Sequence, residues 1–333
     1  MTRTNGLSRI AALALAAALA MTGCSSTPAR EDRPTITPAT PAVAPEPSAP
    51  PAGQVTPAPA GEGLAFDPVG RRLAAITDGA VVLYTVDGGL TEAGRAPTDG
   101  RANQVVPKNG GGFLVAAKNA VLEISGDGKL TPLDTLDSDV LTVADYDHDG
   151  ATTLAGTADG RIVSLGAPSA TKTITGPVEA SRLVVRDDKV AVVDRRQASL
   201  TEVDVAGGTI GRSLRVGRGI TNASIDPFGR IFAVDTGENQ VIGYTIDPFM
   251  ERFLYPVPGS PWAVDYDESA KLMWVTRTAT NEVVAYALAS GMPEQKQRHA
   301  TVRQPNALAV DAKTGTVYVQ SATGGGIQAI PTR

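Results

Sequence analysis

A pattern that recurs about every 40 residues constrains the fold of this chain more than any other feature of its sequence. From residue 60 onward, short runs rich in Val, Leu and Ile alternate with Gly, Asp, Asn and Pro, as in strands joined by tight turns. The first turn of each repeat falls at Asp67, Pro107, Asp147, Arg186, Asp226, Asp267 and Asp311, with spacings of 40, 40, 39, 40, 41 and 44 residues. Seven such units predict an all-β fold, a seven-bladed β-propeller over residues 53–333.

The last unit is one strand short of the others. The chain ends at Arg333, directly after the third strand expected in this unit. The segment GQVTPAP (Gly53–Pro59) precedes the first unit and is similar to the expected outer strands, such as HATVRQP (His299–Pro305). We therefore expect residues 53–59 to supply the missing outer strand, which would close the ring and remove an exposed sheet edge.

The N-terminus has the layout of a bacterial export signal over residues 1–23. Arg3 and Arg9 precede the apolar run IAALALAAALA (Ile10–Ala20), and small residues follow it. Eleven residues rise only about 16 Å as a helix, too little to cross a hydrocarbon core of about 30 Å. The run is therefore expected to be a signal and not a permanent membrane span.

Cys24 is the only cysteine in the chain, and it follows the signal directly in the sequence MTGC. This sequence resembles the bacterial lipobox, a resemblance that implies a diacylglycerol on the Cys24 sulfur, cleavage before it, and palmitate among the acyl chains. The alternative is an ordinary secretory signal that happens to contain a cysteine. Two or three acyl chains would hold the protein durably on the extracytoplasmic face of the cell membrane. Internal disulfides and thiolate metal sites are excluded.

A proline-rich stretch separates Cys24 from the repeats. Residues 25–60 contain ten prolines together with much Ala and Thr. Proline lacks an amide hydrogen and favours extended, polyproline-like conformations. Residues 24–52 are therefore expected to form a flexible linker that lifts the propeller off the membrane.

Two repeats carry a motif at the strand–turn–strand corner: AVDTGENQVIGYTID (Ala233–Asp247) and VTRTATNEVVAYAL (Val275–Leu288). They resemble NHL and YVTN-type propeller repeats, in which an Asp or another polar residue ends the second strand and Asn opens the third. Asp194 fits the same place. Because Asx side chains bridge backbone amides at such corners, these residues are expected to hold the blades together and not to act in catalysis.

A longer resemblance covers the lipobox, the proline-rich stretch and most of the repeats, and it is clearest from Gly219 to the end, in GITNASIDPFGRIFAVD and QPNALAVD. The chain resembles the LppL lipoproteins of mycobacteria and related actinobacteria. This resemblance implies a lipid-anchored propeller of the cell envelope, and it implies no particular biochemical activity.

The residues that start each innermost strand are the candidate ligand-binding residues, because the innermost strands of a propeller surround a central channel. Counting back four or five residues from each turn gives a mostly polar set with one acid, one base and one aromatic: Glu62, Asn103, Thr142, Arg182, Thr221, Trp262 and Asn306. A tryptophan beside hydrogen-bonding groups could stack on a sugar or a peptide. The alternative is that these residues are polar only because they meet water.

The motif DYDHDG is the sharpest local metal signal, with the carboxylates Asp145, Asp147 and Asp149 around a glycine turn. The twelfth position counted from Asp145 is Gly156 and not the Glu that an EF-hand requires. A plain acidic hairpin turn is the preferred interpretation, and a weak calcium site is the alternative. We expect no other cofactor.

Other chemistry finds little support. The two histidines lie in different units, no Ser/His/Asp set can be argued, and no catalytic residue is assigned. The net charge of −5 and the scattered basic residues argue against nucleic-acid binding. We expect a monomeric envelope module that binds a small ligand or scaffolds an envelope protein. The alternative is a lactonase-like hydrolase or an oxidoreductase that uses the channel mouth.

Overall fold

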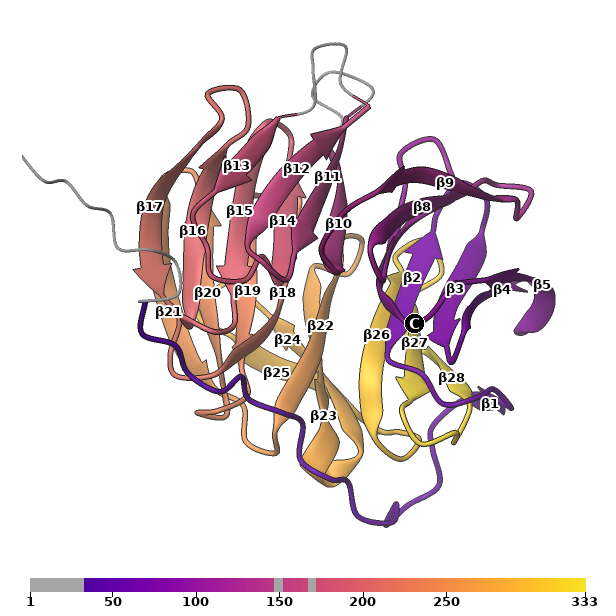
Figure 1. Cartoon of the computed structure of the whole chain (residues 1–333). Coiled ribbons are helices and arrows are strands. Elements are labelled where there is room, and N and C mark those ends of the chain that lie inside the picture. Colours follow the sequence, from indigo (N-terminus) through magenta and orange to yellow (C-terminus); the bar gives the residue numbers. More distant parts are fainter. Residues whose placement is uncertain (1–32, 147–151, 167–171) are drawn as a thin grey trace, which may run out of the picture. The chain divides into compact units, whose positions relative to one another are not determined.

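The computed structural model describes residues 33–146, 152–166 and 172–333 (Figure 1). The predicted export signal, Cys24, and residues Asp147 and Asp149 of the acidic motif lie outside this part of the chain. Residues 34–333 form one compact unit. No helix within the described ranges is long and apolar enough to cross a membrane.

Seven antiparallel four-stranded sheets follow one another around a ring, which confirms the predicted propeller (Figure 1). The first strand of each blade lies innermost and contacts the first strands of its neighbours. These inner strands are β2 (Gly63–Asp67), β6 (Ala102–Pro107), β10 (Val140–Tyr146), β14 (Arg182–Arg186), β18 (Ile220–Ile225), β22 (Pro261–Asp267) and β26 (Pro305–Asp311).

The two middle strands of each blade are almost entirely buried, because neighbouring blades cover both of their faces. This explains why they read as continuous apolar runs and not as an alternating pattern. The second strands are β3 (Arg72–Thr77), β7 (Phe113–Ala117), β11 (Thr152–Thr157), β15 (Lys189–Asp194), β19 (Arg230–Asp235), β23 (Leu272–Arg277) and β27 (Thr316–Ser321). The third strands are β4 (Ala80–Thr85), β8 (Ala120–Ile124), β12 (Arg161–Leu165), β16 (Ser199–Asp204), β20 (Gln240–Ile246), β24 (Glu282–Ala287) and β28 (Ile327–Pro331).

The fourth strands form the polar rim of the ring. They are β5 (Thr91–Pro97), β9 (Leu130–Thr135), β13 (Thr173–Thr175), β17 (Thr209–Arg215), β21 (Phe249–Pro256), β25 (Glu294–Ala300) and β1 (Gln54–Thr56). A single short 3₁₀ turn in the described ranges, η2 (Thr278–Thr280), interrupts this all-strand pattern. Buried apolar side chains gather between adjacent blades and form the core of the ring.

The ring closes as the sequence predicts, through a sheet that contains both ends of the propeller. Strand β1 pairs antiparallel with β28, with Gln54 opposite Ala329 and Thr56 opposite Ile327. Gly53 enters this strand at a φ of +70°, and a Cβ there would lie 2.2 Å from the carbonyl oxygen of Ala329. Only glycine fits this approach.

The seam between the first and last blades is packed like the other seams. The rings of Phe66 and Tyr318 stack across it with centroids 6.1 Å apart. The Arg71 guanidinium donates to the buried carboxylate of Asp311 at 2.9 Å, which joins the two blades by an ion pair. Closure therefore combines strand pairing, apolar burial and a charge-assisted hydrogen bond.

The aspartates at the strand–turn–strand corners have the structural role that the repeats predict. The Asp194 carboxylate accepts hydrogen bonds from the amides of Val178 at 2.6 Å and Arg196 at 2.9 Å. Asp235 accepts from the amide of Gly219 at 2.9 Å. Each carboxylate thus joins the corner to the loop that enters the same blade, and satisfies amides that no strand reaches.

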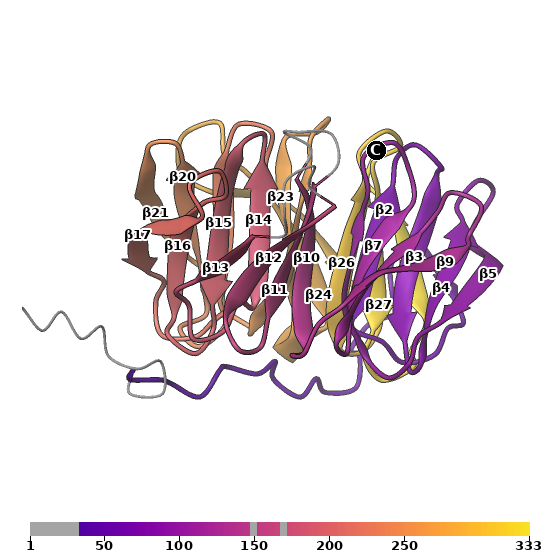
Figure 2. The same ribbon diagram turned by 45° about the horizontal axis from the view of Figure 1, so that its top comes forward.

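Residues 34–52 correct the expectation of a flexible linker. They form an extended strap across one face of the ring (Figure 2). The amide of Ile36 donates to the carbonyl oxygen of Arg196 at 2.8 Å, and the amide of Ala44, only 1% exposed, donates to Gln304 Oε1 at 2.8 Å. Asn281 Nδ2 donates to the carbonyl oxygen of Pro45 at 2.9 Å. The prolines favour an extended chain, and its free backbone groups are bound by polar side chains of the loops beneath.

The strap defines the two faces of the ring. Its contacts lie on loops that lead into the inner strands and on loops between second and third strands. This face is called the strap face below. The opposite face, formed by the turns between the first and second strands, is called the open face.

We predict that β1 contributes more to stability than the rest of the N-terminal segment. A chain that starts at Ala60 lacks the strap and β1, whereas a chain that starts at Ala52 lacks only most of the strap. Loss of β1 leaves β28 as an unpaired edge, so the first variant should melt about 5 to 10 °C below the second, equivalent to about 2 to 3 kcal/mol. Differential scanning calorimetry of the two variants measures this, and equal melting temperatures would contradict it.

Candidate functional site

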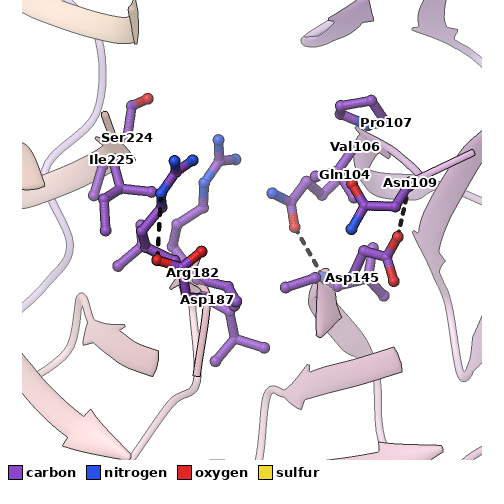
Figure 3. A pocket seen from close by; sticks show the side chains of 16 residues that line it. Gln104, Val106, Pro107, Asn109, Asp145, Arg182, Asp187, Ser224 and Ile225 are labelled. Carbon is purple, nitrogen blue, oxygen red and sulfur yellow. Dashed lines mark hydrogen bonds and ion pairs between the residues drawn. The ribbon is translucent and has the colours of Figure 1, made fainter. Parts of the chain in front are cut away.

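A hollow of about 700 Å³ occupies the part of the central channel that opens on the open face. Strands β6, β10, β14 and β18 and the turns that follow β6 and β14 line it. Figure 3 shows Arg182, Asp187 and Ser224 on one side of the hollow and Gln104, Asn109 and Asp145 on the other. A second, much smaller hollow of about 60 Å³ lies toward the strap face, and both contain Gln104 and Arg182.

The walls of the channel are the inner edges of the first strands, whose backbone amides have no strand partner on that side. Side chains from neighbouring blades accept some of these hydrogen bonds. Gln104 Oε1 accepts from the amide of Val143 at 2.9 Å, and Thr142 Oγ1 accepts from the amide of Leu183 at 3.0 Å. Each blade thereby satisfies and positions the next, which makes the channel wall rigid.

Arg182 is the cation shared by the two hollows. Among the described residues, no hydrogen bond or ion pair within 4 Å reaches its guanidinium. Burial lowers the pKa of Arg182 to about 10, an effect that the carboxylate of Asp265 partly opposes. The side chain therefore remains charged at neutral pH although it is largely removed from solvent.

Asp265 on β22 is the counter-charge. Its carboxylate accepts hydrogen bonds from the amides of Tyr266 at 2.9 Å and Val310 at 3.1 Å. Burial raises its pKa to about 6, and the two amides and the charge of Arg182 act against this shift. At neutral pH the pair is mostly ionised, with opposite charges that do not touch.

The structure brings four of the seven predicted ligand-binding residues together at the small hollow: Glu62, Asn103, Arg182 and Asn306. Asn306 Nδ2 donates to Glu62 Oε1 at 3.1 Å, and Arg101 forms an ion pair with the other Glu62 oxygen at 3.1 Å. Asn103 Nδ2 donates to the carbonyl oxygen of Val140 at 2.8 Å. Glu62 and Asn306 thus satisfy each other at the narrow end of the channel, Asn103 is held by the backbone, and among the described residues Arg182 has no hydrogen-bonded partner there.

The other three predicted residues line neither hollow. Thr142 is fully buried in the wall. Thr221 Oγ1 lies 2.6 Å from Thr236 Oγ1, inside its own blade. Trp262 is partly buried, and its ring centroid lies 5.9 Å from the guanidinium of Arg195, which donates a hydrogen bond to the strap at the carbonyl oxygen of Ala39.

The wide end of the channel contains residues that the spacing of the repeats did not indicate as ligand-binding residues, among them Asn109, Arg186, Asp187 and Ser224. They lie at the ends of inner strands or in the turns that follow. The counting rule selected strand starts and therefore found only the narrow end. Asp265 was missed for a different reason, because it lies in the middle of its strand.

The acidic motif is only partly described. Asp145 lines the wide hollow, and its carboxylate accepts a hydrogen bond from the amide of Asn109 at 2.7 Å. Asp147 and Asp149 lie outside the described residues. Within the described ranges, no three His, Cys, Asp or Glu side chains are grouped so that they could hold a metal ion. The calcium site remains a prediction.

Comparison with known proteins places the chain in a class by its fold. No protein-family model matches it, and no curated protein matches its sequence. A streptogramin B lyase structure is similar, with a TM-score of 0.68, 14% identity, and coverage of 84% of this chain and 96% of that one. A mitotic checkpoint complex structure gives a TM-score of 0.70 at 13% identity, with coverage of 90% and 99%. Identities this low show the fold alone, and the chain is a seven-bladed β-propeller.

The raised pKa of Asp265 predicts a pH-dependent stability. The folded state binds this proton more tightly than the unfolded chain, whose Asp titrates near pH 4. The stabilisation of the folded state by protonated Asp265 is therefore fully present below about pH 4, and it is lost as the pH rises through about 6. Because the carboxylate keeps some contact with channel water, we expect a loss of about 1 to 2 kcal/mol.

Urea unfolding between pH 4 and 8 measures this difference. In the unmodified protein, ionisation of Asp265 should lower the free energy of unfolding by about 1 to 2 kcal/mol as the pH rises. The variant Asp265→Asn should not show this decrease. Asp78→Asn, at an exposed turn, should retain it. Parallel pH profiles for the unmodified protein and Asp265→Asn would contradict the assignment.

Proposed function

We propose that this protein is a binding module of the bacterial cell envelope that takes a small ligand in the wide end of its channel. The observation that carries this proposal is the hollow of about 700 Å³, a volume typical of small-molecule sites. Four blades contribute to its walls, so the polar groups in it are positioned by a rigid ring. The strap lies on the other face and leaves this entrance uncovered.

The proposed location rests on the N-terminal sequence. The resemblance of the MTGC segment to a lipobox, and of the chain to LppL-type lipoproteins, supports acylation of Cys24. Acyl chains would hold the protein on the extracytoplasmic face of the membrane. We propose this anchor together with the binding role.

The strap makes the proposed anchor a short one. Residues 34–52 are held on the ring, so nine residues separate Cys24 from Pro34. Even fully extended, a segment of this length spans only about 30 to 35 Å. The strap face would therefore lie toward the membrane, and the entrance on the open face would lie away from it.

Filling the hollow should abolish ligand binding. We expect Ser224→Trp, on the wall of the wide end, to reduce the amount of any compound that co-purifies with the protein from its host by at least tenfold. Ser213→Trp, on the exposed outer strand β17, should leave it unchanged. Mass spectrometry of the released compounds measures this, and equal retention by both variants would place the ligand elsewhere. Conversion of the compound during incubation would instead favour the hydrolase or oxidoreductase alternative.

Replacement of Cys24 tests the anchor separately. Cys24→Ser should appear in the soluble fraction or accumulate as the uncleaved precursor, because serine offers no thiol for acylation. Cell fractionation and intact-protein mass spectrometry measure the outcome. A variant that still fractionates with membranes and carries acyl mass would refute the anchor.

A further inference from the structure

Among the described residues, several partly buried arginines of the ring have a carboxylate partner that Arg182 lacks. Arg71 forms an ion pair with Asp311, Arg230 with Asp226 at 2.6 Å, and Arg333 with Asp267 at 3.1 Å. In the described part of the chain, Arg182 has no such contact, yet it lies within the channel wall. Burial of a charge without a hydrogen-bonded partner costs free energy, so stabilisation of the fold does not explain this side chain.

The charge of Asp265 balances Arg182 without occupying its donors. The Asp265 carboxylate is bound by the amides of Tyr266 and Val310 and lies more than 4 Å from the guanidinium. A guanidinium presents five N–H donors in a planar fork that matches the two oxygens of a carboxylate or a phosphate. These donors remain available to a molecule in the channel.

Gln104 supplies further donors from the opposite wall. Its side chain is buried, with 5% of the residue exposed, and its Oε1 is occupied by the amide of Val143. This bond fixes the orientation of the amide group, so that Nε2 faces the hollow between the two walls (Figure 3). No acceptor for Nε2 lies within hydrogen-bond distance among the described residues. The two walls therefore direct fixed N–H donors toward one space.

The carboxylates of the hollow lie nearer its entrance. Asp187 lies in the turn after β14, with its Oδ2 3.9 Å from Arg186 Nε. Asp145 accepts a hydrogen bond from the amide of Asn109. A ligand with negative charge along its whole length would meet these acids. A ligand with one anionic group fits better, with that group innermost and a neutral or cationic end at the entrance.

On the basis of the proposed binding role, we propose that the ligand is a small molecule with a single carboxylate or phosphate group, which binds between Arg182 and Gln104. The oxyanion accepts hydrogen bonds from the guanidinium and from Gln104 Nε2. It supplies the contact that Arg182 lacks in the protein alone.

Titration with three probes tests the oxyanion site. Isothermal titration calorimetry at constant ionic strength uses inorganic phosphate, lactate, and lactamide as the neutral analogue of lactate. We expect saturable binding of lactate or phosphate at millimolar concentration or below, and no binding of lactamide. Whichever anion binds more tightly identifies the preferred group. Failure of both anions to bind would overturn the proposal.

Variants of Arg182 show where the anion binds. Arg182→Gln should weaken anion binding at least tenfold, and Arg182→Lys, which keeps the charge and loses the fork, should have an intermediate effect. Arg212→Gln, at an exposed ion pair with Glu202 on the outer strand, should bind within twofold of the unmodified protein. Anion binding by Arg182→Gln at full strength would overturn the proposal.

Thermal stability separates a binding role from a structural one. If Arg182 serves the ligand, Arg182→Gln should melt at the same temperature as the unmodified protein or higher, because the variant removes a partly buried charge that has no hydrogen-bonded partner in the described part of the protein. A fall in melting temperature without loss of anion binding would identify a structural residue and overturn the proposal. A co-purifying compound that Ser224→Trp loses and Arg182→Gln keeps would leave the binding role intact and exclude the oxyanion.

Discussion

The pairing of β1 with β28 is the constraint on which the rest of this structure depends. A propeller has no top or bottom layer to cover its sheets, so each blade is covered only by its two neighbours. If the last blade lacked its outer strand, the seam between Phe66 and Tyr318 would be the weakest in the ring. Three residues from the N-terminal side of the propeller complete that blade and allow every seam to be packed alike.

Closure of the ring also makes the channel chemistry possible. Arg182 is on β14 and Asp265 is on β22, and the blade that begins with β18 lies between their two blades. The two side chains face each other only because the inner strands are held in a circle. The same circle allows Gln104 to accept a hydrogen bond from the next blade and to hold its amide donors in one direction. A sheet that was open at one seam would let these walls separate, and water would then solvate both charges.

The blades were predictable because their turns repeat in a register that the sequence shows directly, with an acid or a proline at most of the corners. The candidate site was less predictable, since register shifts occur at the starts of several inner strands, for example between Val140 and Thr142 and between Ile220 and Asn222. Such a shift changes which side chain faces the channel, and the local amino-acid composition does not predict it. The strap was missed because its contacts use backbone groups and loops far away in the sequence, as between Ala44 and Gln304.

The strap has a mechanical consequence. Its hydrogen bonds to the ring follow one another in chain order. The amide of Ile36 donates to the carbonyl oxygen of Arg196, the amide of Ala42 to Ser260 Oγ, and the amide of Ala52 to the carbonyl oxygen of Ala300. A force that pulls on the N-terminus would load them one at a time, so the strap would peel before any load reached β1. The closing strand β1 therefore bears tension only after the hydrogen bonds of the strap have broken. Under a pulling force the N-terminal segment can extend while the ring stays closed.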